Sequence, residues 1–130
     1  MTEFRWIARR VILTIHAEQL AEHGGRPGIR DEGLLDSALA RPEMKAHDGE
    51  TDLAVIAAAY AYGLALNHPF IDGNKRTAFV ALELFLAKNG HRLTASDEDA
   101  VITFLKLASG DLSEAALAEW VRAHLEAGAP

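Results

Sequence analysis

An uncharged run, LAVIAAAYAYGLALN at positions 53–67, limits most strongly what this chain can fold into. The run is shorter than the ~20 apolar residues that a helix needs to cross a bilayer, and His68 and Pro69 end it. We therefore expect no membrane segment. The run predicts a central helix that the rest of the protein buries on most sides.

A second apolar stretch, AFVALELFLA at positions 78–87, predicts another buried helix. The expected helix extends from about residue 74 to residue 88, and Asn89 and Gly90 provide its stop signal. Its apolar residues cover nearly every face, so it also belongs inside the protein. Two buried helices thus form the expected centre of the fold.

Amphipathic patterns surround these two helices. One helix is expected over about residues 8–23, before Gly24 and Gly25, and a second begins after an Asp31 cap. Two more are expected in the C-terminal third, after caps at Ser96 and Ser113. The sequence therefore predicts an all-α fold with two buried central helices surrounded by about four amphipathic helices.

The boundaries between helices depend on local signals. Pro42 is expected to end the second helix, and the polar segment 42–51 is expected to form an exposed loop or flap. Thr51 or Asp52 would cap the uncharged helix, and Ser96 has the capping-box spacing to Asp99. Strand patterns are absent apart from a few residues at 4–7 or in the flap.

Composition narrows the function classes. The chain has 130 residues, enough for one domain, and its net charge of −6 argues against a general nucleic-acid binder. Since it has no cysteine, disulfides and thiolate chemistry are excluded. The first ten residues, MTEFRWIARR, lack the apolar run of a signal peptide, so a cytoplasmic location is expected.

The chemistry-bearing segment is HPFIDGNKR, residues 68–76, which joins the two buried helices. Gly73 permits close approach of the backbone to a ligand. The helix that begins near Asn74 directs free N–H groups and its positive dipole end out of the loop, which favours an anion. The positive end of that dipole repels the charges of Lys75 and Arg76, and a bound polyphosphate would offset this repulsion.

Two further side chains of the loop suit phosphate chemistry. Asp72 supplies the hard oxygen ligand that Mg²⁺ prefers beside phosphates. His68 is a candidate base, because the histidine side chain has a reference pKa near ~6.5 and can accept a proton from a hydroxyl at neutral pH. Each residue alone has an ordinary structural explanation as a cap, a turn or a solvated charge. Together they form a base, a metal ligand and an anion cradle within nine residues.

HPFIDGNKR resembles the signature of the Fic/Doc family, His-x-Phe-x-Asp/Glu-Gly/Ala-Asn-Gly/Lys-Arg, at every position. The likeness to the death-on-curing (Doc) toxin subgroup covers nearly the whole chain. It includes GGRPGIRDEGLLDSALARP, LFLAKNGHRL and a final helix after ASGDLSE. The resemblance implies a single Doc-like domain over residues 1–130 with the compact Fic helical fold.

Two positions depart from the adenylyl-transferring Fic enzymes: Lys75 stands where they have Gly, and Phe79 where they have a second Arg. Doc-like members share both departures and transfer the γ-phosphate of ATP. The resemblance thus implies a kinase-like toxin of a bacterial toxin–antitoxin system. Its implied target is a threonine of translation elongation factor Tu, whose modification arrests translation.

The resemblance also implies a role for each residue of the loop. His68 is the general base on the target hydroxyl, and Asp72 is the Mg²⁺ ligand. ATP is bound through Gly73 and a phosphate grip made by Asn74, Lys75 and Arg76. Phe70 is expected to be an apolar anchor that pins the loop into the core.

Many Fic enzymes carry their own inhibitory helix with the pattern Ser/Thr-x-x-x-Glu-Gly/Asn, and this sequence has no match. Inhibition is therefore expected from a cognate antitoxin that supplies a helix. Two other functions stay open: an AMP transferase of the same fold, and a catalytically idle antitoxin-binding module.

Some residues outside the loop are assigned to packing or left without a role. His16 is expected to be a packing residue, and Trp6 and Trp120 are expected at the periphery of the core. Arg30 belongs to the Doc-like GIRD segment, but the sequence suggests no chemistry for it.

Overall fold

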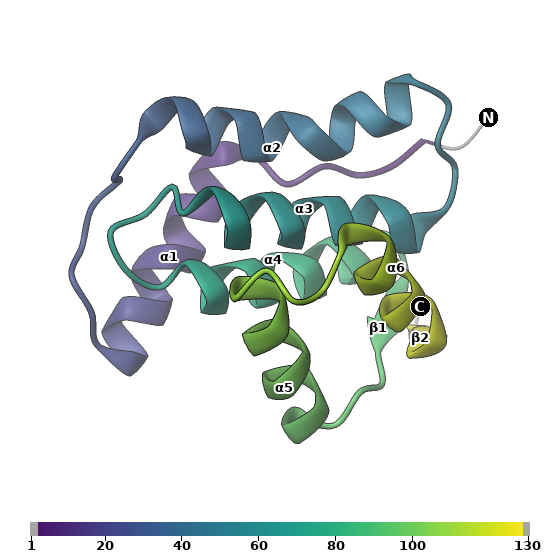
Figure 1. Cartoon of the computed structure of the whole chain (residues 1–130). Helices are drawn as coiled ribbons and strands as arrows, with labels where there is room; N and C mark the ends of the chain where they lie inside the picture. The colour runs from purple at the N-terminus through teal and green to yellow at the C-terminus, as the bar shows by residue number, and fades with distance from the viewer. Residues whose placement is uncertain (1–2, 129–130) are drawn as a thin grey trace.

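The computed structural model describes residues 3–128, which contain six helices and one two-stranded ribbon. In chain order the elements are α1 (Arg9–His23), α2 (Glu32–His47), α3 (Leu53–Asn67), α4 (Asn74–Lys88), β1 (His91–Leu93), α5 (Asp97–Ala108), α6 (Glu114–Ala123) and β2 (Leu125–Ala127). The expected all-α class is confirmed. Helices α3 and α4 lie at the centre, and α1, α2, α5 and α6 surround them (Figure 1).

Helix α3 is the most deeply buried element, with ten of its fifteen residues inside. It packs against α2, α4 and α6. At Gly63 an added Cβ would lie 3.1 Å from the Ala38 Cα and 3.2 Å from the Ala38 carbonyl oxygen, so the glycine lets α2 approach closely. Within residues 3–128, none of the helices is both long enough and apolar enough to cross a membrane.

Most helices begin where local signals predict. Four of them have a side-chain N-cap that accepts a hydrogen bond from a backbone N–H of the first turn, and the caps are Asp31, Asp52, Ser96 and Ser113. The capping box at Ser96 is only half formed. The Asp99 carboxylate accepts a hydrogen bond from the Trp120 indole at 2.9 Å, which ties α5 to α6.

The prediction that Pro42 ends α2 is wrong, because the helix continues to His47 and the expected flap is mostly helical. An interior proline leaves the carbonyl four residues earlier without its N–H donor and costs about 3 kcal/mol. Pro42 is nevertheless buried on the same face as Ala38, against α3. One turn further on, Lys45 pairs with Glu114 of α6 at 3.4 Å. Tertiary packing therefore overrides the local stop signal.

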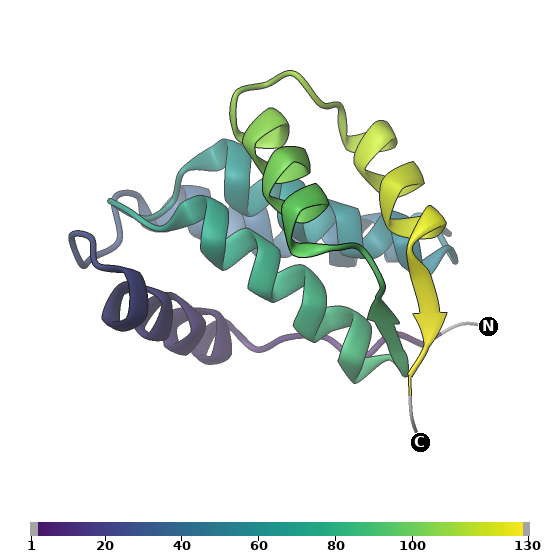
Figure 2. The ribbon, with the colours of Figure 1, turned by 90° about the horizontal axis from the view of Figure 1, so that it is seen from below.

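The few residues at 4–7 with a weak alternating pattern form no strand, since that segment is irregular. The structure instead pairs β1 with β2 in antiparallel register, with Arg92 opposite Glu126 (Figure 2). Each strand has three residues, too few for an alternating pattern to be recognised in the sequence. Only the approach of distant segments creates this ribbon.

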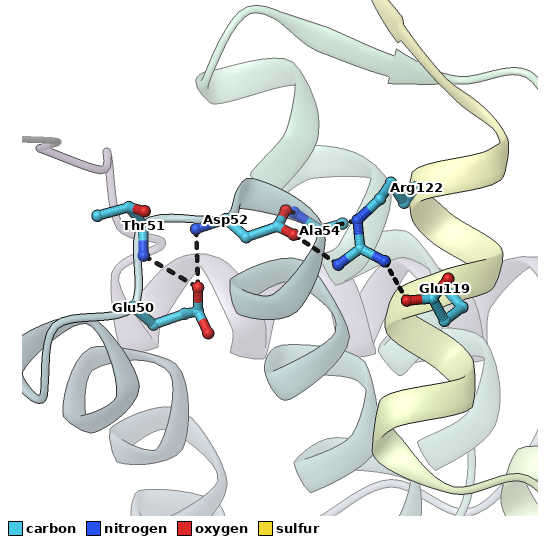
Figure 3. Close-up of polar contacts among 6 residues, drawn as sticks. All are labelled: Glu50, Thr51, Asp52, Ala54, Glu119 and Arg122. Atoms are coloured by element: carbon cyan, nitrogen blue, oxygen red, sulfur yellow. Dashed lines mark hydrogen bonds and ion pairs between the residues drawn. The ribbon is translucent and has the colours of Figure 1, made fainter.

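Polar contacts at the start of α3 attach α6 to the centre (Figure 3). The Asp52 carboxylate accepts hydrogen bonds from the Ala54 N–H at 2.9 Å and from the Arg122 guanidinium of α6. Arg122 also pairs with Glu119 on its own helix. One carboxylate thus caps α3 and holds the last helix against it.

Tyr60 on α3 has the most strongly shifted ionisation in the core. Its side chain is 1% exposed, and its hydroxyl accepts a hydrogen bond from the Ile7 N–H at 3.2 Å. Its ring packs in a cluster with Phe85, at 4.9 Å between centroids, and Trp6, at 6.4 Å. Burial raises the pKa of Tyr60 from 10.0 to about 12, since the phenolate would lose its hydration.

We expect this shift to make the protein less stable as the pH rises from 10 to about 12. In that window the unfolded chain releases the Tyr60 proton and the folded chain keeps it, so the free energy of unfolding falls. The loss attributable to Tyr60 is about 1.4 kcal/mol at pH 11. Urea unfolding from neutral to alkaline pH measures it. Tyr60→Phe should remove this component and Tyr62→Phe should keep it; identical pH profiles for all three proteins would contradict the assignment.

Candidate active site

The loop between α3 and α4 begins with an unusual backbone conformation. His68 directly follows α3 and has φ 48° and ψ 55°, in the left-handed region. It is the one non-glycine residue with a positive φ in residues 3–128. This conformation costs an L-residue roughly 1–2 kcal/mol, so neighbouring contacts must hold it. The His68 side chain is exposed.

The segment that leads into α2 supplies part of that support. Ile29 and Phe70 form an isolated antiparallel bridge. The Ile71 N–H donates to the Gly28 carbonyl at 3.1 Å, and the Arg30 N–H donates to the Pro69 carbonyl at 2.7 Å. The short connection before α2 therefore lies beside the loop and holds its backbone.

Arg30 also contacts the loop with its side chain. The guanidinium donates to the His68 carbonyl at 2.6 Å and to the Asn67 carbonyl at 2.9 Å. Sequence reasoning assigned no role to Arg30. The partners lie 37 and 38 residues away, so no local pattern could have indicated them.

Helix α1 supports the loop from its other side. Phe70 is 1% exposed and stacks on the His16 ring with centroids 3.8 Å apart, which confirms the expected apolar anchor. His16 is buried, as expected for a packing residue, and its Nε2 lies 2.8 Å from the Asp72 carbonyl oxygen. Gly73 has φ 80°, and an added Cβ would lie 3.5 Å from the His16 ring.

Asn74 braces the loop from within. Its side-chain oxygen accepts the Phe70 N–H at 2.9 Å, and its amide nitrogen donates to the Phe70 carbonyl at 2.9 Å. The side chain is buried and both of its polar atoms are engaged with the loop backbone. The amide therefore stabilises the turn, and the phosphate-binding role of Asn74 stays a prediction.

Asp72 is the acidic group of the loop and is half-buried. Its Oδ2 accepts the Arg26 N–H at 2.7 Å, which fixes the carboxylate. In residues 3–128 no cluster of three or more His, Cys, Asp or Glu side chains could hold a metal alone. A single carboxylate nevertheless fits Mg²⁺, which usually takes one or two carboxylates together with phosphate oxygens and waters.

The start of α4 carries two positively charged side chains. Its N-cap is Gly73, which offers no side-chain cap. Lys75 is exposed and Arg76 is half-buried, and neither forms an ion pair with any residue in the described part of the chain. Two cations beside a helix N-terminus without a side-chain cap form a site suited to an anion.

A cavity of about 550 Å³ opens beside this helix start, where α4 lies between α1 and α5 (Figure 2). Its lining residues are Gln19, Glu22, His23, Lys75, Arg76, Phe79, Val80, Asp97, Ala100, Val101 and Phe104. Phe79 packs edge-on against Phe104 with centroids 5.1 Å apart. His68 and Asp72 lie outside the lining. The structure thus brings both predicted cations to the cavity.

We expect Asn74→Ala to destabilise the protein by about 1–3 kcal/mol, since two buried backbone groups of Phe70 lose their partners. Urea unfolding measures the change. Asn67→Ala is the matched control, because that amide makes one hydrogen bond, to the Leu34 carbonyl, and should cost less. An Asn74→Ala protein as stable as the Asn67→Ala protein would contradict the bracing role.

Comparisons with known proteins give the family of the chain. The Fic/DOC family model matches residues 6–86, more than half of the chain. The chain is 33% identical over 119 residues to Protein kinase doc of Escherichia phage P1, which covers 91% of this chain and 94% of that protein. It is 44% identical over 97 residues to Toxin Doc of Mycolicibacterium smegmatis, covering 73% and 71% respectively. The likeness of the loop motif is therefore confirmed, and the chain belongs to the Fic/DOC family, in its Doc subgroup.

Proposed function

We propose that this protein transfers the γ-phosphate of ATP to a serine or threonine hydroxyl of a protein. The observation that carries the proposal is the pair of unmatched cations, Lys75 and Arg76, at the start of α4 beside the loop that presents His68 and Asp72. The relative from phage P1 is named a protein kinase, which supports the same reaction class.

The residues have distinct roles in this proposal. His68 accepts the proton of the target hydroxyl as its oxygen attacks the γ-phosphorus, and ADP leaves as the bond to the bridging oxygen breaks. Lys75, Arg76 and the backbone at Gly73 hold the phosphates. Asp72 would hold Mg²⁺, which when bound neutralises phosphate charge.

The cavity supports a site for the nucleoside. Its α5 side is apolar apart from Asp97, and its α4 side combines both cations with Phe79 and Val80. Phe79 is packed against Phe104, so this position contributes an apolar wall instead of a second phosphate-binding arginine. With Lys75 added and that arginine missing, the triphosphate would bind in a pose that brings the γ-phosphate to His68.

Two partners belong to the proposal. The target is elongation factor Tu, which would place the reaction in the cytoplasm. The second partner is a cognate antitoxin, since the relative from M. smegmatis is named a toxin and the chain lacks the internal inhibitory motif. Val101, Ile102 and Leu105 of α5 are 59%, 52% and 49% exposed, and Val101 lines the cavity. This apolar surface would accept an antitoxin helix that also blocks ATP.

Transfer of label from ATP decides which reaction occurs. Purified protein, Mg²⁺ and bacterial elongation factor Tu are incubated with ATP labelled at either the γ- or the α-phosphate. We expect label from γ alone, reduced at least about 100-fold in His68→Ala because the general base is lost.

His47→Ala is the matched control, since His47 is exposed at the far end of α2 and should not affect transfer. Label from the α-phosphate would instead identify an AMP transferase. Absence of label from both, together with no binding of ATP in calorimetry, would leave a catalytically idle binding module.

Expression in a bacterial host tests the toxin–antitoxin assignment. We expect the intact chain alone to arrest growth, and the same chain to be tolerated with its antitoxin or with His68→Ala. Growth curves at matched protein levels, checked by immunoblot, give the readout. Normal growth with the intact chain and its His47→Ala control would argue against a toxin.

A further inference from the structure

We propose that Arg30 is a positioning residue that holds the backbone of His68 in the conformation required for phosphoryl transfer. The inference rests on the proposed function, in which His68 is the general base. It concerns the contact between residues 28–31, which lead into α2, and the C-terminal end of α3.

The contact is a two-pronged hydrogen bond to the end of a helix. The Arg30 Nε donates to the His68 carbonyl at 2.6 Å, and its Nη2 donates to the Asn67 carbonyl at 2.9 Å. Terminal carbonyls of a helix lack intrahelical partners and carry the negative end of the helix dipole. A planar guanidinium can bind both at once, whereas an ammonium group is a single point donor.

Arg30 is itself fixed at the position where it reaches these carbonyls. Its backbone N–H donates to the Pro69 carbonyl at 2.7 Å, and the Asp31 N–H donates to the same oxygen at 3.1 Å. The Asp31 side chain caps α2 through the Leu34 N–H at 3.0 Å. The guanidinium therefore extends from a backbone anchored both to the loop and to a helix.

The two Arg30 hydrogen bonds act at His68, whose backbone would otherwise relax. His68 has φ 48°, a conformation that L-residues rarely keep without external contacts. The direction of its imidazole follows from this backbone, so release of the carbonyl would misplace the base. Both Arg30 bonds are exposed to solvent, so the carbonyls can bind water when Arg30 is removed and we expect a small loss of stability. The two bonds therefore serve mainly to keep the His68 backbone, and with it the imidazole, in position.

The test compares the parent protein with Arg30→Ala, Arg30→Lys and Arg92→Ala. Arg92 is a matched control because its Nε and Nη2 also donate two exposed hydrogen bonds, to Glu126 on the β1–β2 ribbon. Four quantities are measured: kcat for γ-phosphate transfer, KM for ATP, the melting temperature, and the NMR three-bond coupling that reports φ of His68.

We expect Arg30→Ala to lower kcat about 10- to 100-fold, as for a small misplacement of a reacting group. KM for ATP should change by less than about twofold, because Arg30 lies outside the phosphate grip. The melting temperature should fall by no more than about 4 °C. Arg30→Lys should recover part of kcat, Arg92→Ala should match the parent, and the His68 coupling should change only in the Arg30 variants.

An unchanged kcat and an unchanged His68 coupling in Arg30→Ala would overturn the inference. A fall in kcat that only follows the unfolded fraction would overturn it as well. If the parent transfers no phosphate, the proposed function fails, and the NMR coupling still decides whether Arg30 holds His68. If Arg30→Ala does not fold, Arg30→Lys decides: kcat equal to the parent's overturns the inference.

Discussion

The burial of α3 is the constraint on which the rest of the structure depends. Its small, uncharged residues let α2, α4 and α6 pack against one helix, and at Gly63 the backbone of α2 comes within van der Waals contact. Apolar burial supplies most of the favourable free energy of such a fold. The end of this rigid helix then sets where the chain must turn, and His68 occupies that turn.

The polar side chains around the loop after α3 are of two kinds: some bind the loop backbone, and others have no ion-pair partner in residues 3–128. Backbone atoms of the loop are bound by His16 of α1, Arg30 of the connection before α2 and Asn74 of α4. Lys75 and Arg76 have no ion pair among the described residues. For the proposed function this division would keep the scaffold ordered before a polyphosphate arrives.

The failed predictions share a physical cause. The sequence around Pro42 contains a valid local stop signal, but burial of Pro42 against α3 and the pairing of Lys45 with Glu114 outweigh it. The β1–β2 ribbon has no local signal, because its two strands are about thirty residues apart and three residues long. The motif likewise contains no local signal for the hydrogen bonds between the Asn74 side chain and the Phe70 backbone, which only the folded loop shows.

The sequence by itself determined the helices, their caps, the buried pair α3 and α4, and the residues of the loop between them. These features depend on periodicity, capping and charge over a few neighbouring residues, which a linear pattern records. Only the tertiary structure decided that Phe70 stacks on His16, that the cavity lies between α1, α4 and α5, and that Arg30 reaches the end of α3. Such contacts join residues dozens of positions apart, and they form only when the packing of the whole core brings those residues together.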